Sequence, residues 1–169
     1  MSAMPAERWT VPTDEDVASV PTYVELLRVL ERAHRQLLET VSAELERSGV
    51  TDVNAVQALL LYHMGEEPLT AAEIKTSGRY LGSNVTYNLR KLIEAGRLVE
   101  SRGPNGRGAP RFSATEAGSQ ICALVEGLFE RQSSSLKPLC AMGEADVQQA
   151  SAALAKLERY WTDQVRFRM

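Results

Sequence analysis

The chain has 169 residues, of which 44% are apolar and 24% are charged, with a formal net charge of -3. This composition is typical of a globular domain and excludes a disordered, collagen-like or disulfide-built protein. A chain of this length buries roughly two thirds of the surface that it exposes when unfolded, which is enough for a core without metal or disulfide staples. The two cysteines, Cys122 and Cys140, therefore need not pair.

The sequence offers no candidate for a membrane span. Its longest strongly apolar stretch, residues 56–64, contains Gln57 and His63 and is far shorter than the roughly 20 residues that a span requires. Residues 1–13 lack the charged start and apolar centre of a secretion signal. A reducing, cytoplasmic location is the expectation.

Residues 20–48 predict a long helix. Pro21 suits its first turn, Thr22 and Glu25 have the spacing of a capping box, and Gly49 follows as a terminator. Its apolar positions recur at helical spacing: Val24, Leu27, Leu30, Leu37, Val41 and Leu45.

Two helices are expected next, a second one capped by Thr51 or Asp52 and a short one over residues 71–76. Thr70 and Glu73 have the spacing of a capping box at the start of the short helix.

A further helix with a hairpin after it is expected in the middle of the chain. The helix covers residues 84–95, with Ser83 as its cap. Residues 98–100 and 111–114 predict strands, because the segment between them, 101–110, holds three glycines, two prolines and an Asn-Gly pair. The result is a strand, a basic tip and a returning strand, which is a wing.

Two more helices close the chain, from residue 115 to about 133 and from 144 to about 165, with Pro138 in the gap between them. The predicted fold class is therefore mainly α with a small β-hairpin: a winged helix-turn-helix core flanked by N- and C-terminal helices. We expect an arm over 1–19, a long helix over 20–49, a winged helix-turn-helix lobe over 50–118 and terminal helices over 119–169.

The charge is unevenly distributed along the chain. Residues 70–112 hold eight basic and three acidic residues, a local charge of +5, so the remainder carries -8. A basic middle in an acidic frame is typical of a module that contacts phosphates. The alternative is an ordinary solvated face.

The segment LTAAEIKTSGRYLGSNVTYNLRKLIEAGRLVESRGPNGRGAPRFSATEAG combines a capped short helix, a glycine turn, a helix ending in L-x-x-x-G-x-L, and a basic wing followed by S-x-T-x-x-G. It resembles the DNA-binding core of MarR-family transcriptional regulators, and GSNVTYNLRKLIEAG is most similar to the LdtR-like branch. The usual D-x-R wing tip is replaced by residues 103–107, GPNGR. The resemblance implies sequence-specific binding to double-stranded DNA by a homodimer, with repression more expected than activation.

The helix over 84–95 is the expected recognition helix. Val85, Leu89 and Leu92 recur at four and three residues and predict its buried face. The residues expected at the DNA are Ser83, Asn84, Tyr87, Asn88 and Lys91. Their amide, ammonium and phenol groups suit adenine edges, guanine or phosphate, and phosphate or thymine methyl groups. The alternative is a polar surface helix that follows a turn.

Further DNA contacts are expected on either side of this helix. Arg79 and Tyr80, in the preceding turn, are candidates for the phosphate backbone. Arg102, Arg107 and Arg111 lie on the wing and suit phosphates or a minor groove. The alternative is that these arginines touch nothing.

A second copy is expected because one recognition helix covers only a few base pairs, whereas a dimer covers two half-sites about 34 to 36 Å apart. The candidate interface residues lie on the first and last helices: Leu27, Leu30, Leu37, Leu157, Trp161 and Val165. The alternative is that these stripes pack within one chain, and the family resemblance favours the dimer.

The resemblance also implies a small effector bound between the dimer helices and the DNA-binding lobe. The candidate contacts are His34, Arg35, Tyr62 and His63. A histidine on an apolar stripe is more often an interface residue, so that alternative stays open for His34.

No enzyme is expected, because the sequence holds no nucleophile with a base, no metal-ligand spacing and no phosphate loop. No cofactor or metal is expected either. Cys122 and Cys140 are expected to be structural, since thiol sensing requires a lowered pKa. The alternative functions are a winged-helix module for protein partners and a protein that binds DNA without sequence preference.

Overall fold

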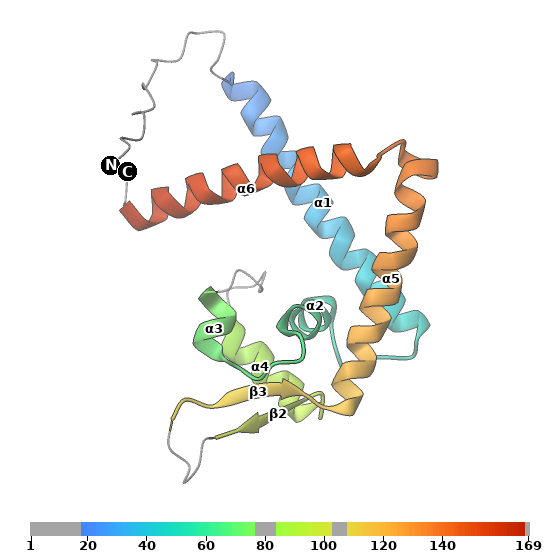
Figure 1. Cartoon of the computed structure of the whole chain (residues 1–169), viewed down its shortest axis with the longest axis vertical. Helices are drawn as coiled ribbons and strands as arrows, with labels where there is room; N and C mark the ends of the chain where they lie inside the picture. Colours follow the sequence, from blue (N-terminus) through green and yellow to red (C-terminus); the bar gives the residue numbers. More distant parts are fainter. Residues whose placement is uncertain (1–17, 77–83, 103–107, 168–169) are drawn as a thin grey trace, which may run out of the picture.

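The computed structural model describes residues 18–76, 84–102 and 108–167, which form six helices and three strands (Figure 1). The helices are α1 (Val20–Arg47), α2 (Ala55–Met64), α3 (Ala71–Thr76), α4 (Val85–Glu94), α5 (Glu116–Cys140) and α6 (Glu144–Phe167). The strands are β1 (Leu69–Thr70), β2 (Leu98–Ser101) and β3 (Arg111–Ala114). The predicted fold class, mainly helical with a small antiparallel hairpin, is confirmed.

The molecule consists of a small lobe and long helices that extend from it (Figure 1). The lobe holds α2, α3, α4 and the sheet, while α5 leaves it beside α1 and α6 then crosses α1. Helices α2 and α5 form the most extensive contact between two elements. The base of α5 therefore carries the lobe.

The starts of α1 and α2 differ from prediction. Helix α1 is capped by Ser19, whose hydroxyl accepts a hydrogen bond from the Thr22 amide, so the expected capping box at Thr22 is wrong. Helix α2 is capped by Asn54, which forms a capping box with Gln57. The predicted cap Asp52 is instead engaged by an arginine from another part of the lobe.

Helix α5 is longer than predicted and runs to Cys140 instead of ending near residue 133. Pro138 stands in its last turn, where the loss of one backbone donor affects a single hydrogen bond close to the helix end. The helix ends at Ala141, which adopts the left-handed conformation with φ 56°. A proline near a helix end was thus not the boundary that its residue type indicates.

The sheet has the order β1-β3-β2, with both pairs antiparallel. The hairpin of β2 and β3 is as predicted, whereas β1 was missed because two residues carry no periodic pattern. Thr70 serves β1 and also caps α3: its amide donates to the Glu73 carboxylate at 2.7 Å, and its hydroxyl accepts from the Glu73 amide at 3.2 Å. The capping box predicted here is confirmed.

Helix α2 is the centre of the hydrophobic core. It is apolar nearly all round, and Leu60 and Leu61 are almost fully buried. A helix of this kind must be covered on every side. The buried residues that cover it come from α1, α4 and α5: Val41, Leu45, Val85, Leu89, Leu92, Ile121, Val125 and Leu128. Each such side chain contributes roughly 1.5–3 kcal/mol by leaving water.

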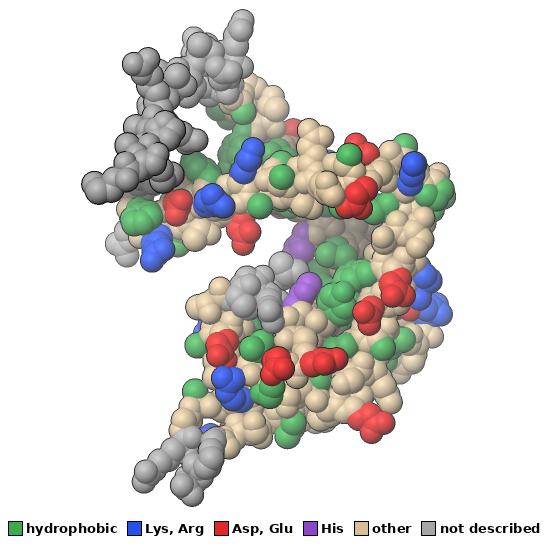
Figure 2. Space-filling model, viewed as in Figure 1, with side chains coloured by type: hydrophobic (Ala, Val, Ile, Leu, Met, Phe, Trp, Pro, Cys, Tyr) green, Lys and Arg blue, Asp and Glu red, His purple; other side chains and the backbone are tan. Residues whose placement is uncertain are grey.

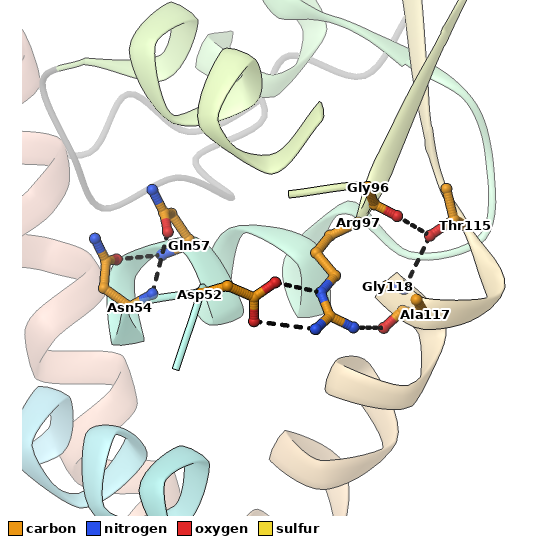
Figure 3. A network of polar contacts seen from close by, with 8 residues as sticks. All are labelled: Asp52, Asn54, Gln57, Gly96, Arg97, Thr115, Ala117 and Gly118. Atoms are coloured by element: carbon orange, nitrogen blue, oxygen red, sulfur yellow. Dashed lines mark hydrogen bonds and ion pairs between the residues drawn. The ribbon is translucent and has the colours of Figure 1, made fainter. Parts of the chain in front are cut away.

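Arg97, which follows α4, joins three parts of the lobe (Figure 3). Its guanidinium donates to both carboxylate oxygens of Asp52, at 3.0 and 3.1 Å, and to the Ala117 carbonyl at 3.2 Å. Bidentate pairing with a carboxylate fixes the guanidinium in orientation as well as position. The segment before α2, the turn after α4 and the first turn of α5 are therefore held together by one side chain.

Thr115 completes this junction. Its hydroxyl donates to the Gly96 carbonyl at 2.8 Å and accepts from the Gly118 amide at 3.1 Å, so it caps α5 and joins it to the α4–β2 turn. Gly118 lies so close to the Arg97 carbonyl that a Cβ at this position would stand 2.1 Å from that oxygen. A glycine is required here by the close approach of two backbones.

We expect Gly118→Ala to lower the free energy of unfolding by about 1–3 kcal/mol, because the methyl group forces α5 away from the α4–β2 turn. The matched control is Gly127→Ala, in the same helix, where the nearest atom to an added Cβ is the flexible end of Arg131 at 3.4 Å. Alanine there should be neutral or stabilising by up to about 1 kcal/mol. Urea unfolding measures both, and equal effects would contradict the close approach.

The Asp52–Arg97 pair should also appear in the pH dependence of stability. Hydrogen bonding to Arg97 holds the pKa of Asp52 below its ordinary value of 3.8. A carboxylate with a lowered folded pKa stabilises the fold above its unfolded pKa, and this stabilisation is lost as the pH falls through the folded value. We expect Asp52→Asn to lower the free energy of unfolding at pH 7 by no more than about 1 kcal/mol. The variant should also lose less stability than wild type as the pH falls below about 4.

Arg97→Gln removes the cation and should flatten the acid limb in the same way. Combining the two substitutions should add nothing to the flattening. Urea unfolding at pH 7 and at several values below pH 4 measures this, and an acid limb unchanged in Asp52→Asn would refute the role of the pair.

Candidate nucleic-acid interface

Helix α4 buries one face and exposes the other. Val85, Leu89 and Leu92 are buried, as predicted. Tyr87 is 53% exposed and Lys91 is also exposed, so both lie where the prediction placed them. Asn84 precedes the helix instead of beginning it: it is the N-cap residue, exposed, with no capping hydrogen bond from its side chain.

Asn88 does not lie on the exposed face, and its prediction as a residue that contacts DNA is wrong. It is 8% exposed, and its side-chain carbonyl accepts from the Gln57 amide at 3.2 Å. The sequence contained the signal, because Asn88 lies three residues after Val85 and four before Leu92, on the stripe that those residues define. Its polar type outweighed its position in the prediction.

Two exposed residues of α4 were missed. Thr86 and Arg90 lie one turn apart on the face that also carries Tyr87 and Lys91. Applying the 3.6-residue period to the buried stripe alone would have found both. The exposed face of α4 therefore consists of Thr86, Tyr87, Arg90, Lys91 and Glu94.

The cations of this face are paired with a carboxylate. Glu94 contacts Arg90 and Lys91, each at 2.8 Å. Hydrogen bonds from Lys91 and then Arg90 hold the pKa of Glu94 below its ordinary value, and the same bond from Glu94 raises the pKa of Lys91. The Lys91 ammonium also lies 6.0 Å from the centre of the Tyr87 ring. Exposed pairs of this kind are weak, so a phosphate can compete with Glu94 for its partners.

The cations of the wing are paired as well. Arg102 contacts Glu100 at 3.0 Å. Arg111 donates to the Pro68 carbonyl at 2.6 Å and to Glu73 at 3.4 Å, so it ties β3 to the segment before β1 and to α3. Arg111 therefore has a structural role that its prediction as a DNA contact did not include. In the described part of 70–112, Lys75 is the one cation without an ion pair.

Four of the predicted DNA contacts lie outside the described residues: Arg79, Tyr80, Ser83 and Arg107. Most of the predicted arm over 1–19 also lies outside them.

The candidate interface helices expose apolar side chains. Helix α6 has no buried residue, and Val165 is 81% exposed. Its contact with the start of α1 includes a hydrogen bond from the Trp161 indole to the Tyr23 hydroxyl at 3.0 Å. Leu27, Leu30 and Leu157 are half-buried, and so is Leu37, which packs against the core of its own chain. The large apolar side chains exposed on these two helices are Val20, Val24, Leu26, Val29, Leu154, Tyr160, Val165 and Phe167.

The four candidate effector contacts do not meet in one place. Tyr62 lines a cavity of about 500 Å³ between the end of α2 and one face of α5, together with Glu66, Cys122 and Glu126. The ring of Tyr62 packs edge to face against the rings of His63 and Phe129, with 5.3 Å between ring centres in each pair. His34 and Arg35 are exposed on α1 and do not line this cavity.

The two cysteines differ in setting. Cys122 is half-buried, and burial raises the pKa of its thiol, with the nearby Glu126 carboxylate acting in the same direction. A raised pKa disfavours the reactive thiolate. Cys140 is exposed and is the last residue of α5.

Within the described ranges, no three His, Cys, Asp or Glu side chains gather closely enough to hold a metal ion. No helix there is long and apolar enough to cross a bilayer.

Comparison with known proteins agrees with this architecture. Residues 53–118 match the family described as a winged helix DNA-binding domain. The chain is 32% identical over 152 residues to the exopolysaccharide II synthesis transcriptional activator ExpG of Rhizobium meliloti, covering 88% of this chain and 76% of that protein. The chain belongs to the MarR family of winged-helix transcriptional regulators.

Solved structures of MarR-type regulators share the fold. FabT of Streptococcus pneumoniae, in complex with DNA, aligns with a TM-score of 0.64 at 18% identity over 83% of this chain and 98% of that one. MepR of Staphylococcus aureus, also in a DNA complex, aligns with a TM-score of 0.63 at 19% identity over 82% of this chain and 98% of that one.

Proposed function

We propose that this MarR-family regulator is a homodimer that binds a palindromic operator in double-stranded DNA and represses transcription by occluding a promoter. The observation that carries the proposal is the exposed face of α4, where cations and a tyrosine stand over an apolar face packed into the lobe. The FabT and MepR structures are complexes with DNA, which supports the same use of the fold.

The contacts follow from exposure and chemistry. Asn84, Tyr87 and Lys91 are proposed to meet base edges or phosphates in the major groove, with Thr86 and Arg90 added on the same face. Arg102 is proposed as a phosphate contact at the base of the wing. The proposal keeps the remaining predicted contacts, which are Arg79, Tyr80, Ser83, Arg107 and Arg111.

The second copy is proposed to cover α1 and α6. The apolar side chains exposed on these helices resemble one half of an isologous interface, in which aromatic and leucine residues are buried against themselves. The proposed division is that of the sequence analysis: an arm, a dimerisation helix, the lobe over 50–118 and terminal dimerisation helices. Placement in the LdtR-like branch also remains a proposal.

A small effector is proposed to bind in the cavity lined by Tyr62 and thereby to cause release of the DNA. This cavity lies where the lobe meets α5, so a ligand there can favour one placement of the lobe over another. The relative ExpG is an activator, whereas we propose repression for this chain. A reporter gene downstream of the operator distinguishes activation from repression, because repression requires its expression to rise when the regulator gene is deleted.

The direct test is fluorescence anisotropy with the duplex upstream of the protein's own gene and with a shuffled duplex, at two salt concentrations. We expect a preference for the native duplex of about 10³ or more and a steep loss of affinity with salt. Equal binding to both duplexes would favour a protein that binds DNA without sequence preference. No binding to either would favour a module for protein partners.

The Lys91–Glu94 pair predicts opposite effects for its two members. Lys91→Ala should weaken operator binding by about 1–3 kcal/mol if the ammonium contacts a base. Glu94→Gln should strengthen it, because it frees Lys91 and Arg90 for phosphate and removes a negative charge from the interface. Lys137→Ala, at an exposed position of α5 outside both the α4 face and the proposed dimer helices, is the control and should change little. Anisotropy titrations measure all three, and weakening by Glu94→Gln would contradict the competition.

The dimer predicts a dependence on the exposed residues of α6. Val165→Glu combined with Leu154→Glu should shift the protein to monomers and weaken operator binding, since a charge buried in an interface is costly. Val99→Glu, on an exposed position of β2, is the matched control and should leave the mass unchanged. Sedimentation equilibrium measures the mass, and a wild-type monomer at micromolar concentration would refute the dimer.

A further inference from the structure

Two buried amides connect α2 to the start of α4. Gln57 is 6% exposed and Asn88 is 8% exposed, and they lie 31 positions apart in the sequence. Gln57 is also the third residue of α2, where it completes the capping box (Figure 3). Buried amides of this kind are held in place by their hydrogen bonds, since an unsatisfied one is costly.

The hydrogen bonds run in one direction. The backbone N–H of Asn54 can only donate, so the atom that faces it at 3.1 Å is the side-chain oxygen of Gln57. The Gln57 nitrogen then donates to the Asn88 side-chain oxygen at 3.2 Å, and the Asn88 nitrogen donates to the backbone carbonyl of Asn84 at 3.2 Å. We call these three bonds the amide relay. Neither side chain can rotate by half a turn without placing like atoms against each other.

The relay ends at the residue where the recognition helix begins. Asn84 is the N-cap of α4, and its side chain makes no capping bond. Its backbone is held from below by Asn88, while its side chain is exposed. The N-terminal residues of a recognition helix are the ones that contact base edges.

We propose that Gln57 and Asn88 are positioning residues for DNA recognition, which set where the N-terminus of α4 stands without touching DNA. This inference rests on the proposed function. It assigns sequence discrimination to a pair of side chains on the inner side of the helix, and it gives Asn88 a role in place of the contact that the sequence indicated.

Gln57→Glu breaks the relay while preserving the cap. A glutamate at this position still accepts from the Asn54 amide, as in the usual capping box, but it cannot donate to Asn88. The Asn88 side chain must then either keep its oxygen against the introduced carboxylate, or rotate and lose its side-chain hydrogen bond to the Asn84 carbonyl. Asn88→Asp breaks the third bond alone, because its side chain accepts from Gln57 and has nothing to donate to the Asn84 carbonyl, which keeps only the bond from the Asn88 backbone amide at 3.1 Å.

The experiment begins with full-length wild-type protein and a random duplex library, from which a preferred duplex is selected. Anisotropy then gives the affinity of each variant for this duplex, for its single-base changes and for a shuffled duplex. We expect Gln57→Glu and Asn88→Asp to lose about tenfold in discrimination between the preferred duplex and its single-base changes. Affinity for the shuffled duplex at low salt should stay within about threefold, because phosphate contacts persist.

Gln120→Glu is the charge-matched control, since it adds one negative charge at an exposed position of α5 outside the relay. It should keep the discrimination of wild type. A purely structural role would lower the urea midpoint and the active fraction but leave the discrimination ratio unchanged. That outcome in the folded variants would overturn the proposal.

Should the acidic variants fail to fold, the double variant Gln57→Met with Asn88→Leu replaces both amides by apolar side chains of similar volume. It should fold and lose the same discrimination, and a wild-type ratio in this variant would overturn the proposal. A wild-type protein that selects no preferred duplex would instead overturn the proposed function, so the two failures are distinguishable.

Discussion

The position of α4 depends on the guanidinium of Arg97. This side chain binds Asp52 ahead of α2 and the Ala117 carbonyl in α5, and its own backbone stands directly after α4. The backbone carbonyl of Arg97 also accepts from the Thr115 amide at 3.1 Å and lies against Gly118. Since the wing strands leave and return at these same residues, the wing, α4 and α5 meet at one point. Arg97 and Thr115 therefore join α5 directly to the turn that follows α4.

The basic character of the lobe is weaker than its sequence indicates. Arg97 is occupied by Asp52, Arg111 by Glu73, and Glu94 partly neutralises Arg90 and Lys91. These pairs are of two kinds. Arg97 and Arg111 also bond backbone carbonyls and so belong to the structure of the lobe. The pairs of Glu94 are exposed and within one helix, where a phosphate can replace the carboxylate at little cost.

The sequence predicted the order of the helices and the hairpin because these depend on local signals: apolar spacing, glycines at turns and a capping box at Thr70. It failed where a distant partner decides the outcome. Asp52 was expected to cap α2, but Arg97, 45 positions away, engages it. Asn88 was expected at the surface, but Gln57 provides a buried partner. The 3.6-residue period places Asn88 correctly, so that error came from giving residue type more weight than spacing. The end of α5 was predicted too early because Pro138 was taken as a boundary, whereas a proline in the last turn of a helix removes few backbone hydrogen bonds.

The segment that leads into α2 anchors both ends of α4. Asp52 binds Arg97, which lies just after α4. Gln57 binds Asn88, whose side chain in turn binds the backbone carbonyl of Asn84, just before α4. Both anchors come from a segment of six residues, and Figure 3 shows the Asp52–Arg97 bonds beside the capping box of Asn54 and Gln57. A helix held at one end can pivot, whereas one held at both ends moves with its support. The other end of α2 carries Tyr62 and the cavity against α5. Under the proposed function, a ligand that displaces α2 relative to α5 would therefore reorient α4 as a whole instead of loosening it.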